Sequence, residues 1–170
     1  WSLEDAATVP LAYAHAFYCL AIKACIRPGH TILVHGGTGA LGQAVISIAL
    51  GYGCQVFTTV SDARKKRFLL RLFPDLKADH IGCSRDNSFR DMVKSMTDGK
   101  CCDIVINSIG GNLRHVSNDC VGDFGCCVDV SQFIDQHEFS YGMSTLSLER
   151  NYITCDFLSI FDAKQTQDMK

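Results

Sequence analysis

The segment from Thr31 to Val45, TILVHGGTGALGQAV, constrains the fold of this chain more than any other part of it. An apolar run typical of a buried strand leads into Gly37-x-Gly39-x-x-Gly42, and a helical pattern follows at once. In a dinucleotide-binding turn the first glycine permits a tight turn, the second lets backbone approach a pyrophosphate, and the third lets helix and strand pack closely. The helix N-terminus adds unpaired N–H groups and the positive end of a dipole. We therefore expect a dinucleotide site rather than a plain turn, formed by Gly37, Thr38, Gly39, Ala40, Leu41 and Gly42.

Strand-like and helix-like patterns alternate along the rest of the chain, which predicts a parallel sheet covered on both faces. The fold class is therefore α/β, a Rossmann-type doubly wound parallel sheet of about six strands with helices on both faces. After an N-terminal helical region from Ser2 to Arg27, strands are expected at Thr31–Gly36, Gln55–Val60, His80–Cys83, Asp103–Asn107, Gly125–Val130 and Tyr152–Phe157. Helices are expected at Ala40–Leu50, Asp62–Phe73, Asn87–Met96, Leu113–Val121 and about Tyr141–Leu148.

Composition excludes several classes of protein. The 170 residues suffice for one domain, with 47% hydrophobic and 20% charged residues, as in ordinary globular proteins. A net charge of −2 gives no support for a nucleic-acid surface, and no apolar run reaches the roughly 18 residues of a membrane span. The ten cysteines and the histidines show neither zinc-site spacing nor a disulfide framework, so we expect no metal and a reducing, cytoplasmic compartment.

The carboxyl ends of the expected strands carry small or polar residues. In a doubly wound sheet the ligand lies outside these ends, near the point where the strand order reverses. Gly36-Gly37, Val60-Ser61, Asn107-Ser108 and Val130-Ser131 should therefore converge on one crevice.

The end of the second strand indicates which nucleotide binds. An NAD site usually has an acidic residue there that binds the ribose 2′-hydroxyl, but here the strand ends in Ser61 and the acid is displaced to Asp62. A run of cations, Arg64 to Arg67, follows and suits a 2′-phosphate, although such a run is also typical of a solvated helix face. This pattern favours NADP over NAD, with Asp62 as the discordant residue.

Several motifs in the same order resemble one known family. They are Trp1–Pro10, Arg27–Gly29, the glycine loop, Val56–Val60, Ser84–Phe89 and Val105–Ser108. Together they resemble the enoyl-reductase domain of animal fatty acid synthases, in the zinc-free branch of the medium-chain dehydrogenase/reductase superfamily, over essentially the whole chain. The resemblance implies NADPH-dependent reduction of a trans-2-enoyl chain bound to acyl carrier protein. Hydride would reach the β-carbon and a proton the α-carbon.

The resemblance also implies roles for individual residues. Gly37, Gly39 and Gly42 would hold the pyrophosphate. Lys65 would meet the 2′-phosphate, with Ser61 and Lys66 close by, and Arg85 would lie near the adenosine. Asn107 and Ser108 would approach the nicotinamide, although a strand-end turn is an equal alternative for these two.

Departures from the family concern the proton donor. Where the family has a Gly-Lys pair after the fifth strand, this chain has Ser131-Gln132, and glutamine cannot deliver a proton as an ammonium group can. The family's second candidate donor is an aspartate after the sixth strand, for which Asp162 is the nearest acid, ahead of Asp156. His15 replaces a threonine of the first helix and is a third candidate, although a histidine there is more commonly a hydrogen-bonded core or rim residue.

The chain also lacks the N-terminal catalytic lobe of this superfamily, so residues 1–170 are expected to be a single NADP-binding lobe, a fragment of a longer multidomain protein. By resemblance the parent would be a homodimer paired through the sixth strand. Two other interpretations stay open: a stand-alone quinone or enone reductase, and a degenerate module that binds nucleotide or supports a dimer without turnover.

Overall fold

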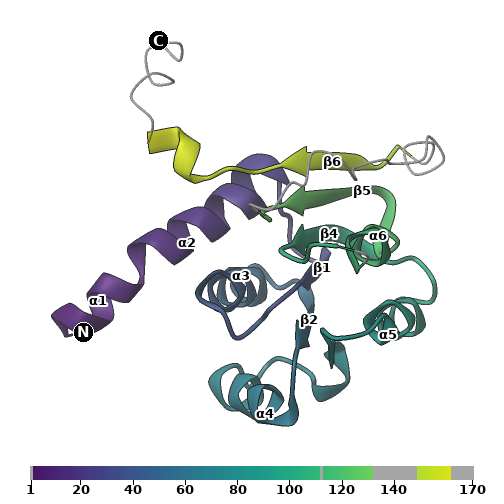
Figure 1. Cartoon of the computed structure of the whole chain (residues 1–170), viewed down its shortest axis with the longest axis horizontal. Coiled ribbons are helices and arrows are strands. Elements are labelled where there is room, and N and C mark those ends of the chain that lie inside the picture. Colours follow the sequence, from purple (N-terminus) through teal and green to yellow (C-terminus); the bar gives the residue numbers. More distant parts are fainter. Residues whose placement is uncertain (1, 112, 132–148, 162–170) are drawn as a thin grey trace.

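Strand β1 (Thr31–Val34) lies in the middle of a six-stranded sheet in the computed structural model, which describes residues 2–111, 113–131 and 149–161. It pairs in parallel with β2 (Gln55–Val60) on one side and β4 (Cys102–Asn107) on the other. The full order is β3-β2-β1-β4-β5-β6, with every pairing parallel (Figure 1). The order reverses between β1 and β4, so the predicted Rossmann-type fold is confirmed. The remaining strands are β3 (Ile81–Cys83), β5 (Val121–Asp129) and β6 (Asn151–Thr154).

Helices cover both faces of the sheet (Figure 1). One face carries α2 (Pro10–Phe17), α3 (Ala40–Gly51) and α4 (Ala63–Leu72), and the other carries α5 (Ser88–Met96) and α6 (Leu113–Asn118). The shorter segments are α1 (Leu3–Thr8), a π-helical segment Tyr18–Lys23 and two 3₁₀ turns, Ala78–His80 and Leu158–Phe161.

Each central strand divides its side chains between two hydrophobic clusters. Ile32 and Val34 of β1 pack with Ala44 and Ile46 of α3, whereas Leu33 between them packs into the other cluster, where Phe89 lies. Strands that are buried on both faces need apolar residues at successive positions, which explains the unbroken apolar runs in the sequence.

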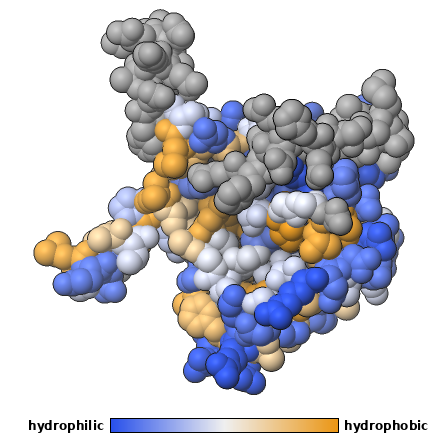
Figure 2. Space-filling view, viewed as in Figure 1, coloured by the Kyte–Doolittle hydropathy of each residue, from blue (hydrophilic) through white to orange (hydrophobic). Residues whose placement is uncertain are grey.

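The N-terminal helices start as the sequence predicts, but one side of them is not covered. Ser2 caps α1 in a reciprocal capping box with Asp5, and Pro10 occupies the first turn of α2. Figure 1 shows α1 projecting from the body of the molecule, and Figure 2 shows hydrophobic surface along this projection. The exposed apolar side chains of these helices and of the segment after them include Leu3, Leu11, Phe17 and Ile22.

Two expected boundaries are wrong. Val121 does not end a helix but begins β5, because it pairs with Cys102 of β4. The register then shifts at a bulge, after which Cys126 pairs with Ile104. The last strand stops at Thr154, three residues earlier than expected. The expected helix at 141–148 lies outside the described residues.

All ten cysteines are free thiols. Within the described ranges, no helix is long and apolar enough to cross a membrane.

Candidate functional site

Two positions of the glycine loop after β1 have no room for a side chain. A Cβ on Gly37 would lie 2.2 Å from Thr58 Oγ1, and a Cβ on Gly42 would lie 2.4 Å from the carbonyl oxygen of Gly36. The third glycine of the motif therefore allows α3 to approach β1, as predicted. The left-handed backbone of the turn is at Gly36 (φ +67°), one residue earlier than the sequence analysis placed it.

The backbone of this loop is open at the start of α3. Gly39 is the N-cap of the helix, and no side-chain hydrogen bond caps it. Gly39 and Ala40 are exposed, and Thr38 and Leu41 are half-buried. Gln43 braces the loop, because its Nε2 donates to the carbonyl oxygen of Thr38 at 2.7 Å. A clear approach to a helix N-terminus is the geometry that binds phosphate, so these residues fit the pyrophosphate of a dinucleotide.

The end of β2 is joined directly to the glycine loop. The backbone N–H of Gly37 donates to the carbonyl oxygen of Thr59 at 3.1 Å, and Ser61 follows two residues later. Asp62 is the N-cap of α4, and its Oδ1 accepts from the backbone N–H groups of Arg64 and Lys65 at 2.9 and 3.0 Å. These bonds, the one from Lys65 foremost, lower the pKa of Asp62. The discordant acid thus has a local role as a helix cap.

Cationic side chains lie near Ser61, at the carboxyl ends of β2 and β3. Lys65 is exposed in the first turn of α4, whereas Nζ of Lys66 donates to the carbonyl oxygen of Ile81 at 3.3 Å. Exposed Arg85 follows the end of β3, which pairs with the end of β2. The fold therefore gathers Ser61, Lys65 and Arg85 at neighbouring strand ends, and it directs Lys66 towards β3.

Asn107 and Ser108 occupy the end of β4 but differ in accessibility. The Asn107 side chain is buried and bonded within its own turn, with Nδ2 donating to the carbonyl oxygen of Ile109 at 3.0 Å. Its Oδ1 accepts from the Ile109 N–H at 3.3 Å. Ser108 is exposed, and its Oγ donates to the carbonyl oxygen of His35 at 3.4 Å, next to the glycine turn. These contacts favour the strand-end turn for the Asn107 side chain and leave Ser108 exposed beside the glycine turn.

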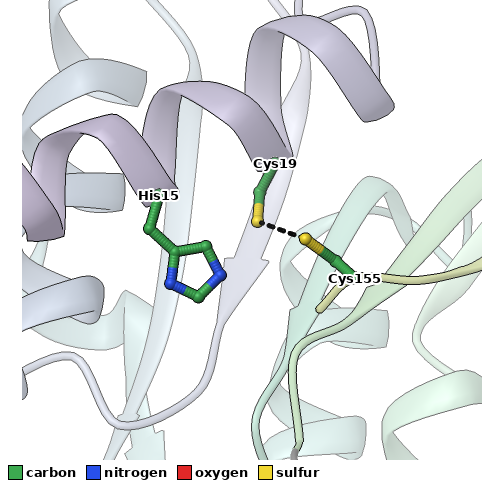
Figure 3. Close-up of side chains that lie close together, drawn as sticks. All are labelled: His15, Cys19 and Cys155. Carbon is green, nitrogen blue, oxygen red and sulfur yellow. Dashed lines mark hydrogen bonds between the residues drawn. The ribbon is translucent and has the colours of Figure 1, made fainter. Parts of the chain in front are cut away.

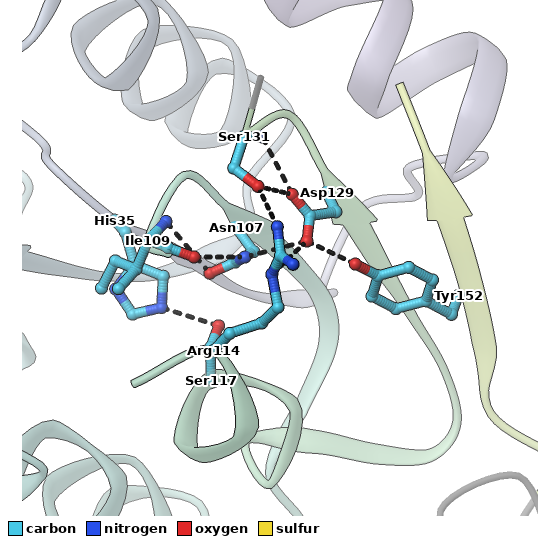
Figure 4. A network of polar contacts seen from close by, with 8 residues as sticks. All are labelled: His35, Asn107, Ile109, Arg114, Ser117, Asp129, Ser131 and Tyr152. Atoms are coloured by element: carbon cyan, nitrogen blue, oxygen red, sulfur yellow. Dashed lines mark hydrogen bonds and ion pairs between the residues drawn. The ribbon is translucent and has the colours of Figure 1, made fainter. Parts of the chain in front are cut away.

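A buried carboxylate organises the ends of β4, β5 and β6 (Figure 4). Asp129 Oδ2 forms an ion pair with Arg114 Nε at 3.1 Å, and it accepts from Asn107 Nδ2 at 3.2 Å and from the Tyr152 hydroxyl. Asp129 Oδ1 accepts from the backbone N–H and the hydroxyl of Ser131 at 2.9 and 2.5 Å. The Ser131 hydroxyl also contacts the Arg114 guanidinium. Both carboxylate oxygens are thus satisfied, as a buried charge requires.

His35 extends this polar layer towards β2 and α6. Its Nδ1 lies 3.0 Å from Thr59 Oγ1, and its Nε2 lies 2.9 Å from Ser117 Oγ. Complete burial lowers the pKa of His35 to about 3, so the imidazole is neutral at physiological pH and acts as a polar spacer.

Sequence reasoning missed the Asp129 network. Its members come from strands and a helix far apart in the chain, and no local spacing links them. One signal was present, because Asp129 is a charged residue directly after a buried apolar run, at the carboxyl end of a strand.

The residues considered for proton delivery differ in where the structure places them. Gln132 and Asp162 lie outside the described residues, whereas exposed Asp156 follows β6. His15 is half-buried, with its Nε2 atom buried and its ring beside the thiols of Cys19 and Cys155 (Figure 3). The Cys19 thiol hydrogen-bonds to Cys155 and lowers the pKa of Cys155, and the same contact raises the pKa of Cys19. His15 is therefore part of a thiol cluster that the sequence analysis did not anticipate.

Two hollows lie at the opposite edge of the sheet, at the amino ends of its strands. The larger, of about 560 Å³, is lined by residues that include Thr31, Gln55, Asp103 and Gly122. The other, of about 390 Å³, lies beside Val56 and His80. Ligands of doubly wound sheets bind at the carboxyl ends, where the glycine loop lies, so we do not assign the site to either hollow.

Comparison with known proteins gives a consistent result. No family model matches the chain. The "Highly reducing polyketide synthase phiA" of Fungal sp. (strain ATCC 74256) is 41% identical over 131 residues, covering 77% of this chain. The "Lovastatin diketide synthase lovF" of Aspergillus terreus (strain NIH 2624 / FGSC A1156) is 37% identical over 166 residues, covering 98% of this chain. The matched regions make up only 5% and 7% of those proteins.

A solved structure matches the fold. The nucleotide-binding subdomain of the enoylreductase domain of PpsC from Mycobacterium tuberculosis superposes with a TM-score of 0.79 and 26% identity, covering 92% of this chain and 87% of that one. The matched synthases are fungal polyketide synthases, so the expected assignment to an animal fatty acid synthase is not supported by them. By sequence the chain is similar to fungal polyketide synthases, and by fold it is similar to the enoyl-reductase domains of such synthases.

Proposed function

We propose that this chain is the cofactor-binding lobe of an NADPH-dependent enoyl reductase within a highly reducing polyketide synthase. The observation that carries the proposal is the glycine loop. Gly37 and Gly42 occupy positions where a Cβ would collide with neighbouring atoms, and the loop leads into the uncapped N-terminus of α3. This arrangement supports a pyrophosphate held by the backbone N–H groups in the first turn of α3, since those of Gly37 and Gly39 already donate to the carbonyl oxygens of Thr59 and Gly36.

Specificity for the 2′-phosphate would come from the end of β2. Lys65 is exposed beside Ser61, and Arg85 lies at the adjoining end of β3. Asp62 would repel a phosphate if it faced the nucleotide, but its carboxylate is bonded to the first turn of α4 and to Ser61. Cations around a small hydroxyl residue support NADPH over NADH.

Bound NADPH would supply a hydride to the β-carbon of a trans-2-enoyl chain. The residues of this chain would bind and orient the reactants. The Asp129 network fixes the ends of β4 and β5, and Ser108 is the exposed side chain beside the glycine turn. We do not assign proton delivery to His15, because its Nε2 is buried among the sulfurs.

The substrate and partners follow from the synthase context. The chain spans about one twentieth of the length of the curated relatives it matches, so these points concern the whole protein. We expect the enoyl chain to be tethered to a carrier protein of the same synthase. A catalytic lobe elsewhere in that protein would form the second wall of the cleft. β6 is the last strand of the sheet, and its position supports the expected homodimer.

Replacement of Lys65 tests the cofactor. Lys65→Ala should weaken NADPH binding by about 1.5–3 kcal/mol, the range for a lost charge-assisted hydrogen bond, and leave NADH binding nearly unchanged. Calorimetry with both nucleotides measures the difference. Arg71→Ala is the matched control, because Arg71 is an exposed cation in the last turn of the same helix. Equal losses for both nucleotides, or an equal effect of Arg71→Ala, would contradict the proposal.

A second function, nucleotide binding without turnover, is favoured by one observation. The Ser131 hydroxyl is bonded to Asp129 and Arg114, and Gln132 follows where the resembling family has a lysine. Enoyl reduction by the complete synthase distinguishes the two functions. Tight NADPH binding without reduction would support the binding module and exclude the reductase.

A further inference from the structure

Three potential metal ligands from two distant segments meet on the side of the sheet that carries α2. His15 of α2 and Cys19 of the π-helical segment are four residues apart and lie on one side of the continuous helix. Cys155 follows β6 directly, and its Sγ is 3.7 Å from that of Cys19. One ligand atom from each residue lies within 4.8 Å of the other two. Figure 3 shows the imidazole and both sulfurs close together.

The imidazole of His15 is held in position but lacks a partner at one nitrogen. Its ring stacks on Phe157 at 4.7 Å between centroids, with an interplanar angle of 9°. Nε2 is buried and meets no group in hydrogen-bonding geometry in the described part of the chain, and the Cys155 thiol is the polar group that interacts with the ring. A buried polar atom in that state costs free energy unless a ligand satisfies it. The arrangement is that of a preoriented ligand.

The donor set selects the kind of ion. Two thiolates and an imidazole favour zinc over the oxygen-binding ions magnesium and calcium. Sulfur ligands about 2.3 Å from a tetrahedral zinc lie about 3.8 Å apart, close to the 3.7 Å between Cys19 and Cys155. Two thiolates also neutralise one divalent ion, which suits apolar surroundings that include Ala16 and Leu20.

We propose that His15, Cys19 and Cys155 bind one zinc ion, with the fourth coordination position open. The ion would join the N-terminal helix to the carboxyl edge of the sheet. Cys155 is tied to this edge, because its backbone N–H donates to the carbonyl oxygen of Asp129 at 2.8 Å. The spacing of the cysteines and of the other histidines predicts no metal, and this proposal departs from that expectation. Its local sequence signal is the His-x-x-x-Cys spacing from His15 to Cys19.

Metal titration of the reduced, chelator-treated protein tests the site without any nucleotide. Zinc should bind with a stoichiometry of one and raise the melting temperature, because it binds the folded state. Cobalt in its place should give a thiolate-to-cobalt charge-transfer band. X-ray absorption of the zinc protein should show two sulfurs at about 2.3 Å and a nitrogen at about 2.0 Å. The absorption measurement needs no variant, so it is decisive even if a substitution impairs folding.

Variants locate the ion. Cys19→Ser and Cys155→Ser should each reduce the charge-transfer band to about half or less, because each removes one of the two thiolates, and His15→Ala should remove the nitrogen ligand. Cys25→Ser is the control, because Cys25 is an exposed thiol outside the cluster and its loss should change nothing. The proposal is overturned if zinc binding survives both cysteine substitutions, or if absorption shows no sulfur ligand. A Cys19–Cys155 disulfide that persists in the chelator-treated, reduced protein would overturn it as well.

Discussion

The candidate site differs between two parts of the sheet. At the ends of β1 and β2 it consists of exposed backbone, because glycines place no side chain there. At β4, β5 and β6 it consists of side chains bonded to one another. Gly37 and Gly42 contribute by having no side chain. Asp129 contributes through contacts with four other side chains. The first region leaves the N–H groups at the start of α3 open to an anion, and the second has already satisfied its own charges. We therefore expect the first region to bind the ligand and the second region to hold the strand ends in place.

Removal of the buried carboxylate should have the largest effect on stability. Asp129→Ala leaves the Arg114 guanidinium buried without its counter-charge, and the loss of one partner of a buried pair costs about 3–5 kcal/mol. Urea unfolding measures this loss. Asp123→Ala is the control on the same strand, since Asp123 pairs with Arg150 while 64% exposed and should cost less than about 1 kcal/mol. Similar losses in both variants would remove the distinction between a buried network and a surface pair.

Adding one methyl group at Gly42 should destabilise the glycine loop. The Cβ of Gly42→Ala would lie 2.4 Å from the Gly36 oxygen and 2.8 Å from the Gly37 Cα, both backbone atoms. We expect a loss of about 1–3 kcal/mol in stability, the usual cost of overpacking, together with weaker NADPH binding. Gly51→Ala, at the other end of α3, meets no atom within 4 Å and should be neutral or slightly stabilising. If both variants behave alike, close approach is not the reason for the third glycine.

The third prediction concerns the protonation of His35, which should appear in the pH dependence of the free energy of unfolding. The imidazole has a pKa of about 3 when folded and 6.5 as its ordinary value, so between these values the unfolded chain binds an extra proton. Stability should therefore decrease by about 2 kcal/mol between pH 7.5 and pH 5. His35→Gln keeps two hydrogen-bonding atoms and cannot titrate in this range, so the pH dependence of unfolding should be correspondingly weaker in the variant. Identical profiles would contradict the buried, neutral imidazole.

The difference between local patterns and contacts of distant segments explains what could be predicted from sequence. The glycine loop, the Ser61–Lys65 region and most strands follow from local patterns, because glycine contacts, caps and apolar runs act over a few neighbouring residues. The pairing of Asp129 with Arg114 and Tyr152 depends on which strands become neighbours. The meeting of His15 with Cys155 depends on where the chain after β6 returns. Neither is encoded in local spacing, and the start of β5 at Val121 was missed for the same reason, since it is defined by a partner on β4.

The central position of β1 has a consequence for synthesis of the chain. Ile32 pairs with Val56 on one side, but its partner on the other side, Ile104, is made roughly 70 residues later. At a synthesis rate of about 5–20 residues per second, the second edge of β1 stays unpaired for some 4–14 s until β4 is made. During this interval an apolar strand edge is unpaired, the condition in which chains associate wrongly. The glycine loop leads directly into α3, which can fold at once and cover one face of β1 while its second edge is still open.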